Sequence, residues 1–182
     1  GQLQVIANTG DDFEHLGLPI CPDIDTLIYT LAGIANPETG WGLRDEHWQF
    51  MAALGELGGP TWFRLGDGDL ATHIYRHELL LQGHTLSEAI SALRAARGVA
   101  VPIWPMSDAP VRTVIDTADG PLDFQDYFVR QQARPVATGF RYTGSESARA
   151  SSGALRALTA PGLAAIIVTP SNPWLSIAPI LS

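Results

Sequence analysis

Four aspartates lie within fifteen residues of one another near the beginning of the chain. Asp11 and Asp12 directly follow an apolar stretch, and Asp23 and Asp25 come shortly afterwards. Carboxylates at such a density repel one another unless a cation neutralises them. Mg²⁺ is a natural partner, because it takes oxygen ligands and bridges to phosphate groups. The structural alternative is capping, since aspartate is common at helix starts and in turns.

A second motif, GDGDLA at 66–71, matches the G-x-G-x-x-A pattern of dinucleotide-binding loops. Its two acids would face a pyrophosphate, so a tight turn and helix cap is the better interpretation. The loop also fails as a calcium site, because Thr72 stands where such loops need glycine. His73 and His77 have a spacing that suits zinc, but no third ligand is indicated, which favours an ordinary polar helix face.

Two further loops follow apolar segments. Ser171 and Asn172 lie in the Pro-Ser-Asn-Pro loop after 163–169, where hydroxyl, amide and backbone donors could meet an anion. The alternative interpretation is a plain turn. Asp108 follows the segment 99–105, and an aspartate in that setting is more often a surface residue than a site residue.

The elements that must position these residues alternate along the chain. Residues 3–8 form an apolar run typical of a buried parallel strand. Apolar spacing and helix caps then predict four helices, at 25–35, 45–57, 69–82 and 85–96. Asp23 or Asp25 would be the N-cap of the first and Asp69 the cap of the third, and a capping box would begin the fourth.

The second half is richer in strands. The predicted strands are 99–105, 112–117, 122–129 and 163–169, with a hairpin turn at 119–120 and a helix near 151–160. Strand–loop–helix units at both ends favour an α/β fold with a parallel sheet. We expect residues 1–182 to form one domain, in which about 99–143 make a smaller lobe or an antiparallel extension of the sheet.

Composition excludes several classes of protein. Of 182 residues, 46% are hydrophobic, which supports a sizeable core and excludes intrinsic disorder. The net charge of −8 and the lack of a basic cluster argue against nucleic-acid binding. One cysteine excludes an internal disulfide framework, and the apolar runs are too short to span a membrane. A cytoplasmic enzyme or binding protein is the expectation.

Seven motifs in order support a closer identification. They are NTGDD (8–12), CPDIDT (21–26), GWGLRDE (40–46), RLGDGDLATH (64–73), PMSDAPVRT (105–113), DFQDYFV (123–129) and PSNPWLSIAPIL (170–181). With them the chain resembles the 2-phospho-L-lactate transferase family of coenzyme F-420 biosynthesis over its whole length.

The resemblance implies a reaction, a cofactor and a fold. A guanosine diphosphate donor carries 2-phospholactate, phosphoenolpyruvate or 3-phosphoglycerate. A hydroxyl of the deazaflavin Fo attacks the distal phosphorus of this donor, and GMP leaves with Mg²⁺ as the required cofactor. The implied fold is a Rossmann-like parallel sheet with helices on both faces and a smaller inserted α/β lobe, and the full-length protein would be a homodimer. Such phosphoryl transfer depends more on positioning and charge neutralisation than on a nucleophilic side chain.

The resemblance also assigns residues. Asp25, in CPDIDT, and Arg64, ahead of the GDGD motif, would contact Fo, together with Asn8 and Thr9 of NTGDD. Catalysis would fall to Asp11 and Asp12. The remaining assignments are donor binding by Ser171, Asn172 and Asp108, and Mg²⁺ binding by a subset of Asp11, Asp12, Asp23 and Asp25.

The chain departs from the family pattern at both ends. We expect it to lack the family's N-terminal Gly-rich strand-loop, which binds phosphate, and its C-terminal third. Gly68 stands where a basic residue is usual, which would weaken binding of the donor phosphates. Two alternatives stay open: a regulatory nucleotide-sugar-binding protein of the same superfamily, which would bind a UDP-sugar without turnover, and a non-catalytic fragment that only self-associates.

Overall fold

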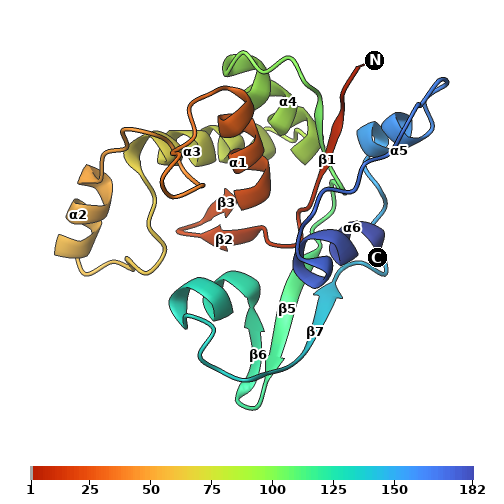
Figure 1. The fold of residues 1–182 in the computed structure, drawn as a ribbon. Coiled ribbons are helices and arrows are strands. Elements are labelled where there is room, and N and C mark those ends of the chain that lie inside the picture. Colours follow the sequence, from red (N-terminus) through yellow and green to blue (C-terminus); the bar gives the residue numbers. More distant parts are fainter. Residues whose placement is uncertain (1) are drawn as a thin grey trace.

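The computed structural model describes residues 2–182, and its parallel sheet is a pair of short strands, of which Figure 1 labels the first, β1. β1 (Val5–Ala7) pairs with β4 (Ile103–Pro105), with Val5 opposite Ile103. Both strands are shorter than the apolar runs that predicted them. The pair brings the N-terminal acidic loop beside a segment nearly a hundred residues away in the sequence.

Helices cover both sides of this pair. Ile103 of β4 packs with the helix α4 (Leu86–Ala96), whereas the next residue, Trp104, meets α5 (Ser152–Leu158) at Gly153. Successive residues of a strand point to opposite faces of a sheet. The predicted α/β class, with parallel strands between helices, is therefore confirmed.

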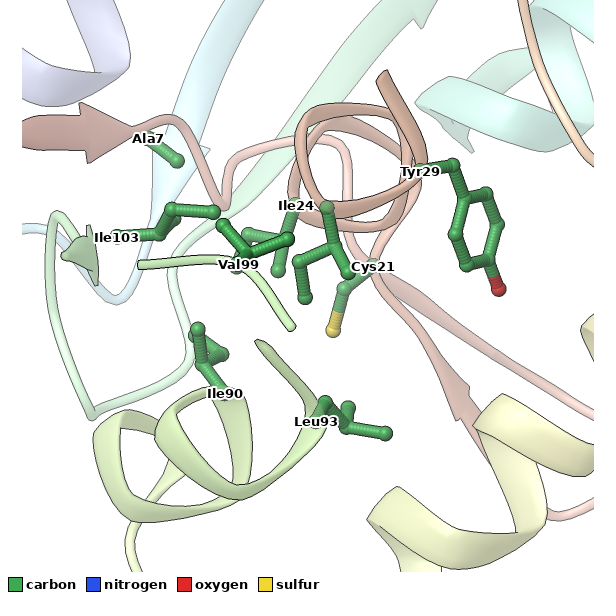
Figure 2. Close-up of a cluster of buried hydrophobic side chains, with 9 residues drawn as sticks. Ala7, Cys21, Ile24, Tyr29, Ile90, Leu93, Val99 and Ile103 are labelled. Carbon is green, nitrogen blue, oxygen red and sulfur yellow. The ribbon is translucent and has the colours of Figure 1, made fainter. Parts of the chain in front are cut away.

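The core on the α4 side contains Ala7, Ile24, Ile90, Leu93 and Ile103 (Figure 2). These residues come from β1, β4, α4 and the first helix, α1 (Pro22–Leu31), all of which place apolar side chains in one cluster. Burying such side chains stabilises the fold by about 25 cal/mol per Å² of apolar surface. This packing fixes the start of α1 against the end of β1, where the four aspartates lie.

The remaining helices of the first half are α2 (Gln49–Glu56) and α3 (Asp67–Leu81). The predicted capping box at α4 is confirmed, because Thr85 Oγ1 accepts a hydrogen bond from the Glu88 amide at 3.2 Å. The capping interpretation is wrong for Asp23 and Asp25, which lie in the first turn of α1 after the N-cap residue Cys21. It is also wrong for Asp69, which lies inside α3.

Two antiparallel sheets complete the β structure. β2 (Phe13–His15) and β3 (Leu18–Ile20) form a hairpin that the sequence analysis did not predict. β5 (Arg112–Thr117) lies between β6 (Gly120–Asp123) and β7 (Ala137–Thr143). The predicted hairpin between β5 and β6 is present, but its turn is at 118–119, one residue before the predicted position. The predicted strand 122–129 stops early, because a π-helical turn, η1 (Asp126–Arg130), follows β6.

The C-terminal part differs most from expectation. The predicted strand 163–169 is wrong: these residues are exposed, Ile167 by 80%, and within residues 2–182 no strand pairs with them. A strand exists only where a neighbour takes up its backbone hydrogen bonds. The chain then closes with η2 (Pro173–Ile177) and α6 (Ala178–Leu181). Among the helices of the described residues, none has the length and apolarity that crossing a membrane requires.

Candidate functional site

The NTGDD loop leaves the sheet at the carboxyl end of β1, where open α/β sheets bind ligands. Asn8, which is buried, organises this loop: its Oδ1 accepts a hydrogen bond from the Gly10 amide at 2.8 Å. Its Nδ2 donates to Asp23 Oδ2 at 2.9 Å and to the Leu175 carbonyl at 3.2 Å. One side chain thus ties together the end of β1, the start of α1 and the C-terminal turn η2.

Asp11 and Asp12 carry unusual carboxyl groups. Burial, reinforced by the nearby charge of Asp23, raises the pKa of Asp11 from 3.8 to about 7. Burial raises the pKa of Asp12 to about 8, even though Arg112 and Arg76 favour its charged form. Carboxyls that change protonation near neutral pH are typical of sites that bind cations or transfer protons.

Within the part of the chain that the structure describes, four buried oxygen atoms of this region have no hydrogen-bond partner. They are Thr9 Oγ1, Asp11 Oδ1, Asp12 Oδ1 and Thr113 Oγ1. Buried polar atoms without partners cost free energy and are rare, so a group of four needs an explanation. Buried hard oxygen atoms without partners suit Mg²⁺ or the hydroxyl groups of a substrate.

A hollow of about 100 Å³ lies beside the acidic loop, between it and β5, with Phe124 and Gln125 on its far wall. Arg112 of β5 lines the hollow and donates to the Thr9 carbonyl at 3.4 Å. The approach is so close at Gly10 that a Cβ atom there would lie 2.9 Å from Thr113 Oγ1. The hollow therefore combines carboxylates, a guanidinium and two aromatic rings, those of Phe13 and Phe124.

Asp25 lies deeper than the other acids and is 4% exposed. Its Oδ1 forms an ion pair with Arg76 of α3, while its Oδ2 has no hydrogen-bond partner. His73 of α3 lies between Asp25 and Asp69, with nitrogen–oxygen distances of 3.6 and 3.3 Å. Tyr29 donates a 2.6 Å hydrogen bond to Asp69. Three ionisable groups of α3 thus surround the buried carboxylate of α1.

This buried cluster is also a candidate metal site by composition. Within residues 2–182, the only three potential ligands whose atoms all lie within 4.8 Å of one another belong to Asp25, Asp69 and His73. Asp11, Asp12 and Asp23 do not form such a group. The Arg76 guanidinium already balances charge in the buried cluster, and a cation repels a second cation at close range.

Arg64 lies apart from the acids in this arrangement. It is exposed, and its guanidinium lies 4.1 Å from the centre of the Trp48 ring. In the part of the chain that the structure describes, no ion pair joins Arg64 to Asp25 or to the acidic loop. The cation beside Asp25 is Arg76.

The three expected donor-binding residues divide between two places. Asn172 caps η2, because its Oδ1 accepts hydrogen bonds from the amides of Trp174 and Leu175 at 2.9 and 3.0 Å. Ser171 beside it is exposed, and the Asn8–Leu175 bond brings this turn next to the acidic loop. Asp108 instead accepts a 2.7 Å hydrogen bond from the Ser87 amide at the start of α4.

Sequence reasoning missed three residues of this region. His73 was interpreted as part of a polar surface, but it is 1% exposed. Arg76 was not considered, although four clustered carboxylates require a nearby cation and Arg76 lies only three residues further along the same helix. Arg112 could have been noticed for the same reason: clustered carboxylates require a cation, and Arg112 is a basic residue within the PMSDAPVRT motif.

Comparisons with known proteins agree with the motif resemblance. The family model described as "2-phospho-L-lactate transferase CofD" matches residues 1–182. A phosphoenolpyruvate transferase of Kitasatospora aureofaciens is 40% identical over 186 aligned positions, and a 2-phospho-L-lactate transferase of Methanopyrus kandleri is 40% identical over 181. These alignments include 100% and 99% of this chain but 57% and 58% of the relatives. The chain thus spans little more than half the length of these proteins.

A solved structure shares the fold at much lower sequence identity. It is a member of the UPF0052 family from Bacillus halodurans, with a TM-score of 0.59 and 14% identity. The match covers 99% of this chain and 54% of the other. At this identity the likeness concerns the fold alone.

Proposed function

Because the chain belongs to the CofD 2-phospho-L-lactate transferase family, we propose that it carries the acceptor side of a phosphoryl-group transferase in coenzyme F-420 biosynthesis. The reaction joins a hydroxyl of the deazaflavin Fo to the distal phosphorus of a guanosine diphosphate donor and releases GMP. The donor carries 2-phospholactate or a related three-carbon acid. One observation carries this proposal: the carboxylates of NTGDD and CPDID converge at the carboxyl end of β1.

The residues present suit Mg²⁺. Oxygen atoms of Asp11, Asp12, Thr9 and Thr113 are buried without partners, and Mg²⁺ prefers such hard oxygen ligands. We assign Mg²⁺ binding to the Asp11 and Asp12 carboxylates, with Asp23 held nearby by Asn8. When bound there, the ion neutralises charge on the diphosphate of the donor.

Asp11 lines the hollow beside the acidic loop, so its carboxylate can also orient the Fo hydroxyl that enters there. In the proposed reaction this hydroxyl loses its proton to solvent as its oxygen bonds to phosphorus. The bond between that phosphorus and the GMP oxygen breaks, and GMP leaves with the bonding electrons. Arg112, which lines the same hollow, would stabilise the added negative charge.

Titration of the chain with fluorescent Fo tests the proposal, with Mg²⁺ and GDP both present and then omitted. We expect saturable binding that is at least about tenfold tighter with Mg²⁺ than without it, since metal and ligand share the acidic loop. Asp11→Asn should remove this dependence on Mg²⁺. Glu146→Gln is the matched control, because Glu146 is exposed.

A folded, monodisperse chain that does not bind Fo would refute the proposal. Saturable binding of a UDP-sugar in place of Fo would support the regulatory nucleotide-sugar-binding alternative. Aggregation of the purified chain, measured by light scattering, would support the fragment that only self-associates.

A further inference from the structure

Arg76 is wholly buried, with an exposed fraction of 0%. Arginine is almost never fully buried unless it is paired, because removing its charge from water is costly. The Arg76 guanidinium donates to the Pro19 carbonyl of β3 at 3.0 Å and to Asp25, and it lies 3.4 Å from His73 Nδ1. Contacts to two other elements, β3 and α1, and to a neighbour on its own helix leave this group little freedom to move.

The charge of Arg76 acts on both acidic motifs. It forms an ion pair with Asp25 of CPDID, and it also favours the charged form of Asp12 in NTGDD. The Cys21 thiol and the Tyr29 hydroxyl also lie close enough to interact electrostatically with the Arg76 guanidinium. Among the described residues, Asp12 and Arg112 line the hollow, whereas Arg76 does not.

His73 meets the second oxygen of the Asp25 carboxylate, beside Arg76. Its two ring nitrogens face the carboxylates of Asp25 and Asp69, and Tyr29 holds Asp69 by a hydrogen bond. His15 of β2 is the further ionisable group that faces His73. The Asp25 carboxylate therefore has its orientation set by α3.

We propose that Arg76 and His73 are positioning residues: Arg76 holds the Asp25 carboxylate in one fixed orientation, and His73 packs against the other oxygen of that carboxylate. This inference rests on the proposed function, in which Asp25 contacts Fo. Neither Arg76 nor His73 contacts the substrate.

The role requires arginine in particular. Its planar fork donates in two fixed directions, here to a carbonyl and to a carboxylate, whereas the ammonium of lysine is a point charge on a flexible stem. A misplacement of about 1 Å in a binding group can cost about a hundredfold in activity. Lysine should therefore preserve the charge of the cluster but not its geometry.

A double-mutant cycle tests this coupling. The chain is prepared as Asp25→Asn, Arg76→Met and the double variant, and each is measured for its Fo dissociation constant and its thermal midpoint. We expect each single change to weaken Fo binding by roughly tenfold to a hundredfold. The double variant should bind no more weakly than Asp25→Asn alone, because Arg76 acts through that carboxylate. Its midpoint should exceed that of Arg76→Met, which leaves a buried charge unpaired.

Conservative changes separate geometry from folding. Arg76→Lys should keep a thermal midpoint near that of the wild type but still bind Fo roughly tenfold more weakly. Arg97→Met is the control for loss of a cation near α3, because Arg97 donates only to Thr72 at 3.4 Å. His73→Gln should weaken Fo binding, whereas His77→Gln on the same helix should not.

Wild-type affinity in Arg76→Lys, or multiplicative losses in the double variant, would overturn the inference. Stabilisation by Zn²⁺ or Mn²⁺ that disappears in His73→Gln would also overturn it, since Asp25, Asp69 and His73 would then be metal ligands. If the folded wild type does not bind Fo, the proposed function fails. Coupled midpoints in the cycle would then still support Arg76 as the group that holds Asp25, and additive midpoints would refute that as well.

Discussion

The buried carboxyl of Asp12 should make this protein less stable as the pH rises. The pKa of Asp12 is about 8 in the folded chain, against 3.8 for an exposed aspartate. Between these two values the folded chain holds a proton that the unfolded chain has lost. Unfolding therefore releases a proton, and the free energy of unfolding falls as the pH rises toward 8.

The size of the effect follows from the same two values. Each tenfold difference in proton affinity corresponds to 1.36 kcal/mol. Compared with a pH below both pKa values, the free energy of unfolding above pH 8 is therefore lower by at most ~6 kcal/mol. Relaxation and water penetration reduce such penalties in real proteins, and half of the limit, ~3 kcal/mol, is a reasonable expectation. For a chain of this length that corresponds to a change of roughly 6–12 °C in the thermal midpoint.

Asp12→Asn removes the titrating carboxyl group and replaces it with an amide of nearly the same shape. We expect the thermal midpoint of Asp12→Asn to match the wild type at pH 4 and to exceed it increasingly up to pH 8.5. Differential scanning fluorimetry across this range measures both curves. Added Mg²⁺ should raise the midpoint of the wild type at pH 8 but not that of Asp12→Asn, because a ligand that binds only the folded chain stabilises it.

Parallel curves for the wild type and Asp12→Asn between pH 4 and 8.5 would refute the reasoning. Such a result would mean that Asp12 ionises at its ordinary pKa and that water reaches it. Glu146→Gln serves as the control, since an exposed carboxyl should leave the curve unchanged.

Three further changes test the fold around the site by thermal unfolding. Tyr29→Phe removes the 2.6 Å hydrogen bond to Asp69 and should lower the free energy of unfolding by ~1–3 kcal/mol; no change would mean that Asp69 finds another donor. Gly153→Ala places a Cβ against the Trp104 ring and should cost ~1–3 kcal/mol, and an unchanged midpoint would show that α5 can move away from β4. Thr85→Ala breaks the capping box of α4 and should cost ~1 kcal/mol, whereas a larger loss would mean that the cap also supports Asp108.

Local signals in the sequence were enough to predict most elements of the fold. Thr85 and Glu88 predicted the start of α4, and the Asp-Gly signal at 119–120 predicted the β5–β6 hairpin to within one residue of its turn. The β2–β3 hairpin was missed because its turn, Leu16 and Gly17, does not match the usual Asn-Gly signal, although both residues have positive φ. The position of the acidic loop followed from one correctly predicted strand, since β1 ends just before it.

The segment 163–169 shows that local composition is not enough to predict a strand. Its run of leucine, isoleucine and valine has the composition of a buried strand, yet it is exposed. Composition says which residues suit a strand, but pairing depends on a neighbour at the correct distance and register. That information belongs to the whole sheet and cannot be obtained from the segment itself.

Helix α3 shows why the buried side of the site was missed. A surface helix is recognised because its apolar residues share the face that meets the core. In α3 the fully buried positions include Thr72, His73 and Arg76, which are polar or charged. In its hydrophobic pattern such a helix resembles one that is exposed to solvent. Its buried face can be recognised only from the need of a buried carboxylate for a cation. Asp25 is a buried acid that needs a cation, and α3 supplies Arg76 from a face that hydrophobic patterning assigns to water.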